Sequence, residues 1–188
     1  MQLHKRAVVD EAVAILDNYG IADLTMRRLA RELDVSPGAL YWHFANKQEL
    51  LGAVADHVLT AAVSPAGADS WSSRVTELAT RLRDALLSHA DGAELVSASF
   101  AAGQSAVMMQ IMNRLSEAAT DAGVEPPHAE LAARTILYYV LGFTADEQSR
   151  LQLDAAGADL PAEQSVLAAD PSARFAFGLQ LLIDGIHA

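Results

Sequence analysis

The side chains best suited to chemistry lie in one N-terminal stretch, residues 25–47, and they are hydrogen-bond donors. They are a hydroxyl, a guanidinium, a phenol, an imidazole and an ammonium group, carried by Thr25, Arg27, Tyr41, His43 and Lys47. Donors of these types bind the phosphate oxygens of DNA, and an arginine can also make two hydrogen bonds to the edge of a guanine. The stretch therefore predicts a DNA contact, with Arg27 as the best candidate for reading a guanine.

Two short helices separated by a turn are predicted to position these donors. Thr25 is a good N-cap for a helix over residues 26–33. After a break, Ser36 caps a second helix that has Pro37 at its first position and is about seven residues long. In a helix-turn-helix the first helix crosses the DNA backbone while the N-terminal end of the second enters the major groove. This arrangement assigns DNA recognition to the second helix.

The beginning of that second helix is small enough to approach base edges. Gly38 and Ala39 lack bulk, and the methyl group of Ala39 can meet a thymine methyl. The major groove is roughly 12 Å wide, which admits one α-helix. Residues 36–39 are therefore expected to lie against the bases.

Packing is the alternative for some residues of this stretch. The second helix needs an inward face, so Tyr41, Trp42 and Phe44 could pack in a core or an interface. Packing is the favoured interpretation for Phe44 and, less strongly, for Trp42. Arg28 and Arg31 suit ion pairs with their neighbours as well as they suit DNA. The row of donors has no such structural role, and it favours DNA binding for the motif as a whole.

The rest of the sequence has the periodicity of further helices and no alternation typical of strands. A helix is expected over Leu3 to Tyr19, and Asn46 with Glu49 begins a connector helix over residues 46–62. Later helices are expected over 70–88, 93–99, 105–122 and 127–150, and from Pro171 onward, with a loop over 154–170 that holds a short helix near 161–166.

The expected fold class is all-α, with two domains. A three-helix helix-turn-helix DNA-binding domain over residues 1–47 contains the recognition motif at 25–44. A helical ligand-binding and dimerisation domain over residues 48–188 follows it.

Composition places the chain among globular proteins. With 188 residues, 52% of them hydrophobic, it can bury a sizeable core, and it has no cysteine for disulfides or thiolate metal sites. The N-terminus lacks the apolar region of a signal peptide, and no apolar run approaches the roughly 20 residues that span a membrane. A cytoplasmic protein with no membrane contact is expected.

The net charge of −11 is unevenly distributed along the chain. Residues 1–47 hold six basic and six acidic side chains, whereas residues 48–188 hold seven basic and eighteen acidic ones. Phosphates are repelled by an acidic surface, so DNA is expected to approach only the N-terminal domain.

The stretch from Leu24 to Lys47 resembles the signature of the tetracycline-repressor (TetR) family. Three parts of that signature occur in order, Leu-Thr-x-Arg, Ala-x-x-Leu-x-Val and Leu-Tyr-x-His-Phe-x-Asn-Lys. The resemblance implies a three-helix DNA-binding unit that a fourth helix joins to an all-α, dimerising regulatory body. It also implies DNA contacts at the matching positions, which are Thr25, Met26, Arg27, Ser36, Pro37, Gly38, Ala39, Tyr41, Trp42, His43 and Lys47.

The resemblance continues towards the C-terminus, where the chain is similar to the tetracycline repressors themselves. The similar segments are Trp71 and residues 85–93, 141–142, 146–148 and 175–185. The metal-binding histidine of that subgroup falls on Val96, and its neighbouring Thr-Arg pair falls on Ser99 and Phe100. Its drug-contacting His, Asn and Phe fall on Val63, Leu78 and Leu82.

These replacements change what the body is expected to bind. A magnesium-tetracycline chelate needs oxygen or imidazole ligands, which valine and leucine do not supply. No tetracycline, metal or cofactor is therefore expected. One interpretation is a pocket for a small, hydrophobic or flat aromatic effector of unknown identity, and the other is a filled core. The candidate ligand-binding residues are Val63, Leu78, Leu82, Val96, Ser99, Phe100, Met108 and Met112.

A homodimeric transcription repressor is the predicted function. The last helix and the helix over 127–150 are expected to pack against their copies and to bury Phe177, Leu182 and Ile186. Two DNA-binding domains spaced by roughly 34–36 Å, or a multiple of it, would read a pseudo-palindromic operator on double-stranded DNA. An effector that fits a different spacing would lower operator affinity and release the repressor.

Other functions remain open to different degrees. A ligand-dependent activator has the same motifs, and so does a ligand-binding scaffold or carrier with a non-functional DNA-binding domain. An enzyme is not expected, because the segment 103–106 lacks the second glycine and the strand of a nucleophile elbow. Glu125 and His128 have a metal-binding spacing, but two prolines lie between them and no second copy exists.

Overall fold

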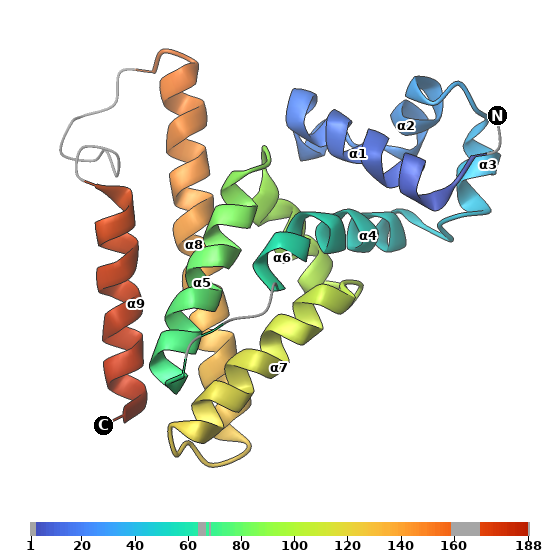
Figure 1. Ribbon diagram of the computed structural model, residues 1–188. Helices are drawn as coiled ribbons and strands as arrows, with labels where there is room; N and C mark the ends of the chain where they lie inside the picture. Colours follow the sequence, from blue (N-terminus) through green and yellow to red (C-terminus); the bar gives the residue numbers. More distant parts are fainter. Residues whose placement is uncertain (1–2, 64–66, 68, 159–169, 188) are drawn as a thin grey trace.

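One helix joins an N-terminal group of short helices to a larger helical body (Figure 1). The computed structural model describes residues 3–63, 67, 69–158 and 170–187. These residues contain helices and no β-strand, which confirms the all-α fold class. The elements are α1 (Lys5–Tyr19), η1 (Ile21–Asp23), α2 (Met26–Glu32), α3 (Pro37–Tyr41), α4 (Lys47–Leu59), η2 (Thr60–Val63), α5 (Trp71–Leu87), α6 (Gly92–Ala101), α7 (Ala106–Asp121), α8 (His128–Ala155) and α9 (Pro171–His187).

Helices α1 to α3 form a small unit, which we call the head (residues 3–47). Each helix contributes buried apolar side chains to one core, including Leu16, Leu29 and Leu40, and Phe44 joins them from the segment after α3. α3 is shorter than the sequence predicts and ends at Tyr41, since the chain turns at Trp42 and His43. The head thus resembles a helix-turn-helix in which α2 and α3 share one buried face.

The connector helix α4 begins where its capping residues predict. The Asn46 side chain accepts a hydrogen bond from the Glu49 amide at 2.8 Å. The Glu49 carboxylate reaches back to the Ala45 amide at 2.9 Å, one residue earlier than in a standard capping box. α4 packs against α1 on one side and against α5, α6 and α7 on the other, so it contacts both parts of the molecule.

Helices α5 to α9, from Trp71 to His187, form the part that we call the body, in which the long α8 packs against α5, α6, α7 and α9. α8 continues to Ala155, beyond the predicted end at Arg150, so a loop that begins at Asp154 is wrong. Residues 151–155 are exposed and are mostly good helix formers, which lets the helix extend with little burial. The short helix expected near 161–166 lies outside the described residues.

Arg83 on α5 and Glu147 on α8 form a buried ion pair beneath α9. The Arg83 Nε and one Nη donate to the two carboxylate oxygens of Glu147 at 2.9 and 2.6 Å. The Arg83 guanidinium also lies 5.3 Å from the ring centroid of Phe175 on α9. This cluster joins three helices that lie far apart in sequence.

Tyr139 completes the attachment of α9. Its hydroxyl donates to the Phe175 carbonyl at 2.8 Å, and a Cβ at Gly178 would lie only 2.3 Å from that hydroxyl oxygen. Burial raises the pKa of the Tyr139 phenol, although the charge of Arg83 opposes this shift. The phenol therefore stays protonated and keeps its role as a donor near neutral pH.

No single helix among the described residues is long and apolar enough to cross a membrane. α6 and α7 pass that test only as a pair, and they meet at a bend of 85°.

Candidate functional site

The hydroxyl groups at the starts of α2 and α3 act as helix caps. Thr25 Oγ1 accepts from the Arg28 amide at 3.1 Å, and Ser36 Oγ accepts from the Ala39 amide at 3.3 Å. Each cap uses an oxygen lone pair and leaves the hydroxyl proton free. Thr25 and Ser36 can therefore cap their helices and still donate a hydrogen bond to a phosphate.

The predicted donors differ in how much of each side chain reaches solvent. Arg27 is exposed, Tyr41 is 51% exposed, and His43 and Lys47 are half-buried. Trp42 is 90% exposed, so it does not pack in the core of the head, and packing in an interface stays a prediction. An indole this exposed has no partner to pack against within the described protomer.

Phe44, by contrast, is only 2% exposed and packs in the head core, which confirms the packing interpretation. Lys5 of α1 lies 5.2 Å from the centroid of its ring. Met26 at the start of α2 is also half-buried and packs against the core. Met26 thus has a packing role in addition to the DNA contact that the resemblance implies.

Arg27 and its neighbour Arg28 have different surroundings in the structure. The Arg28 guanidinium lies 3.7 Å from the ring centroid of Tyr19 and 2.5 Å from an Asp23 carboxylate oxygen. It also lies 3.8 Å from a Glu32 oxygen, and its side chain is largely buried. Arg28 therefore braces the end of α1 against α2, which sequence spacing alone left open.

The N-terminal end of α3 is open to a close partner. Pro37 and Gly38 are exposed and Ala39 is half-buried. A Cβ built at Gly38 would meet only Ser36 Oγ, at 3.8 Å. Nothing in the described protomer therefore covers the surface that was predicted to face the bases.

The predicted effector residues are mainly core residues. Leu78, Leu82, Val96, Met108 and Met112 belong to one buried cluster, against which Val63 and Phe100 pack. Ser99 is also buried, and its hydroxyl has no hydrogen-bond partner among the residues that the structure describes. A buried hydroxyl without a partner costs about 1–3 kcal/mol, so a ligand that met it would gain that much. The choice between a pocket and a filled core stays a prediction.

An open groove of about 1080 Å³ runs between α6 and α8 on the other side of α6. Phe100 lines it, together with Met109, Arg134, Tyr138 and Leu141. Hydrogen bonds to Glu130 and to Tyr138 raise the pKa of Arg134 above its ordinary value, so this guanidinium is always charged. Sequence reasoning missed Arg134 and Tyr138, although their spacing of four residues places both on one side of a helix.

The described residues contain no cluster of metal-ligating side chains. No group of three or more His, Asp or Glu side chains there is placed to hold a metal ion. Asp146 accepts a hydrogen bond from Arg150 Nε at 3.1 Å.

Two family models match the chain in succession. Residues 8–54 match the family described as bacterial regulatory proteins, tetR family. Residues 64–170 match the tetracyclin repressor-like C-terminal domain. The two matches correspond to the head with part of α4 and to most of the body.

Individual proteins are similar over nearly the whole chain. The class C tetracycline repressor of Escherichia coli is 33% identical over 99% of this chain and 91% of its own length. The crystal structure of Mycobacterium smegmatis BioQ is 61% identical with a TM-score of 0.92, and covers 99% of this chain and 98% of its own.

A structure of BioQ with its natural double-stranded DNA operator is 58% identical with a TM-score of 0.86, covering 100% of this chain and 99% of its own. These relatives are DNA-binding regulators of transcription rather than enzymes. Both matched family models and these full-length similarities lead to one conclusion: the chain belongs to the tetR family of bacterial regulatory proteins.

Proposed function

We propose that the protein is a dimeric, cytoplasmic repressor that binds a pseudo-palindromic operator through its heads and releases it when a small apolar effector binds the body. The observation that carries this proposal is the uncovered end of α3 beside exposed Arg27, Tyr41 and Trp42. Support comes from BioQ, which is 58% identical and was crystallised with its operator. No catalytic role is proposed.

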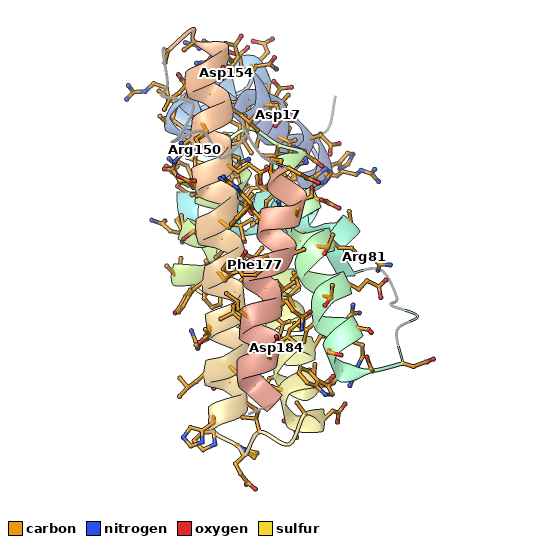
Figure 2. All side chains as sticks on the ribbon, turned by 90° about the vertical axis from the view of Figure 1, so that its left-hand side faces the viewer. Asp17, Arg81, Arg150, Asp154, Phe177 and Asp184 are labelled. Atoms are coloured by element: carbon orange, nitrogen blue, oxygen red, sulfur yellow. The ribbon has the colours of Figure 1, made fainter. Side chains whose placement is uncertain are left out.

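The outer face of α8 and α9 fits the proposed dimer. Phe177 on α9 is 68% exposed, and Leu181 and Tyr138 are more than half exposed. Figure 2 looks onto this face, where α8 and α9 run side by side and Phe177 lies between them. Leu182 and Ile186 pack partly in the core of their own protomer, so Phe177 and Leu181 offer more surface to a partner.

The contacts of α4 with the loop between α6 and α7 offer a route from effector to head. A Cβ at Gly52 would lie 2.3 Å from the Gln104 carbonyl oxygen, so helix and loop touch backbone to backbone. The Asp56 carboxylate accepts from the Ser105 hydroxyl at 2.6 Å and from the Val107 amide at 3.0 Å. A ligand that displaces α6 would therefore move α4, and the head with it.

The proposal is tested by operator binding. A labelled fragment from upstream of the protein's own gene is titrated at several salt concentrations, with a scrambled fragment of equal length as control. We expect specific, salt-dependent retardation by a dimer and lower transcription in vitro. No retardation at low salt would contradict the proposal, weak binding that ignores both sequence and salt would favour a carrier, and higher transcription would indicate an activator.

Magnesium and tetracycline together are expected to leave the operator complex intact. Val96, Leu78 and Leu82 provide neither a metal ligand nor a polar contact for the chelate. The measurement is operator release monitored by fluorescence anisotropy, with the class C tetracycline repressor as positive control. Saturable release at the concentrations that release the control would overturn this expectation.

A further inference from the structure

We propose that Asp17 and Asp91 form a reciprocal latch that fixes the angle between head and body, and so sets which half-site spacing the dimer accepts. The two are positioning residues, since neither lies on the surface proposed to touch DNA. The inference rests on the proposed function. It adds a second attachment of the head, separate from the connector α4.

Asp17 is the residue of the head in this latch. It lies near the C-terminal end of α1, and this end of the helix lies next to the turn between α5 and α6 (Figure 1). One of its carboxylate oxygens accepts from the Ala90 amide at 3.1 Å. His89 Nδ1 lies 3.2 and 3.1 Å from the two oxygens and donates to the carboxylate. One carboxylate of the head is thus held by two consecutive residues of the body.

Asp91 provides the half that the body contributes. Its Oδ2 accepts from the Ile21 amide of the head at 2.9 Å, and its Oδ1 accepts from Gln152 Nε2 of α8 at 2.6 Å. Asp91 has φ 53°, a left-handed conformation that Asp and Asn adopt more readily than most residues. A Cβ at Gly20 would lie 2.7 Å from Asp91 Oδ2, so the absence of a side chain at residue 20 leaves room for the Asp91 carboxylate against the backbone of the head.

α8 holds the turn that carries the latch. The Gln148 side chain is buried, donates to the carbonyls of Leu86 and His89 at 3.0 and 2.8 Å, and accepts from the Ala93 amide at 3.1 Å. Together with Gln152 it fixes the turn to the helix that bears Tyr138 of the proposed dimer face. The head is therefore attached to a helix of the proposed dimer face, and not only, through α4, to the helices around the proposed effector pocket.

The latch restricts a rotation of the head relative to the body that α4 alone would permit. α4 alone could turn about its contacts at Gly52 and Asp56, and this turn would swing the recognition helix. The latch holds the far end of the head, at Asp17 and Ile21, against the body. Because one base pair moves a half-site by about 3.4 Å along the DNA axis, a small swing suffices to change the preferred operator.

The test compares operators whose half-sites are separated by the natural spacing, by one base pair more and by one base pair less. The full-length variants are Asp17→Ala, Asp91→Gly and both together. Glycine is chosen at residue 91 because it tolerates the left-handed conformation. Asp91→Asn keeps one acceptor oxygen, so its effect on the spacing preference should lie between those of the parent and Asp91→Gly. Asp10→Ala is the control on the same helix, because within the described part of the chain Asp10 forms an ion pair only with exposed Arg6, at 3.9 Å.

We expect each latch variant to reduce the preference for the natural spacing by about tenfold, while its affinity for a single half-site stays unchanged. A variant that binds half-sites normally and retains the full preference of the parent would overturn the proposal, whatever its melting temperature. Equal weakening on all operators and half-sites would also overturn it, since that result indicates a damaged head. A parent protein that binds no operator would instead contradict the proposed function.

Discussion

Replacing Arg27 by Ala is expected to weaken operator binding by about 5- to 150-fold, which corresponds to about 1–3 kcal/mol. Arg27 is exposed on the first turn of α2, whereas its neighbour Arg28 is held by Tyr19 and Asp23. A guanidinium in this position can make two hydrogen bonds to O6 and N7 of one guanine. The change is measured by anisotropy titrations against the parent operator and against operators with each guanine of the half-site replaced.

The pattern across those operators distinguishes base reading from phosphate binding. If Arg27 reads a guanine, the variant loses discrimination at that one position and keeps it elsewhere. Arg27→Lys should share most of the loss, because a lysine lacks the planar fork. Arg31→Ala is the matched control on the same helix, exposed and 3.4 Å from Glu32. Uniform weakening on every operator, with a shallower salt slope, would show that Arg27 binds only phosphate.

Replacing Glu147 by Ala is expected to lower the free energy of unfolding by about 3–5 kcal/mol. The change leaves Arg83, which is only 6% exposed, without its carboxylate partner. The carboxylate that remains near Arg83 is that of exposed Asp84, at 3.9 Å, and it compensates only a small part of the desolvation cost of the buried guanidinium. Urea unfolding of the full dimer at fixed protein concentration measures the difference, since dimer stability depends on concentration.

Two comparisons isolate the buried charge as the cause. Glu130→Ala removes an exposed partner of Arg134 on the same helix, and we expect it to cost less than about 1 kcal/mol. Arg83→Met combined with Glu147→Leu removes both charges and should recover most of the lost stability, because methionine can still pack on Phe175. A double variant that is less stable than Glu147→Ala would show that packing, not the unpaired charge, dominates.

Local signals predicted the helices and the DNA-binding motif because their physics acts within a few residues. Thr25, Ser36, Asn46 and Ser70 each cap a helix where the sequence places one, since each side chain meets an amide three residues ahead. The end of α8 was the least predictable boundary. Residues 151–155 have no stop signal and no burial to define where the helix ends.

Side-chain environment was harder to predict than helix position. Trp42 and Phe44 are both aromatic and only two residues apart, yet one is 90% and the other 2% exposed. Helical periodicity does not extend reliably past Tyr41, where α3 ends and the backbone turns. The direction of each ring therefore depends on how α4 and α1 close the head.

Residues 25–47 by themselves determined the chemical nature of the surface proposed to face DNA, because donor type and capping are properties of neighbouring residues. Only the tertiary structure decided which arginine remains available, since Arg28 is bound by Tyr19 at the end of another helix. It also brought Asp17 to Ala90 and Asp91 to Ile21, pairs about seventy residues apart in sequence. Such contacts follow from how helices pack in space, which local periodicity does not encode.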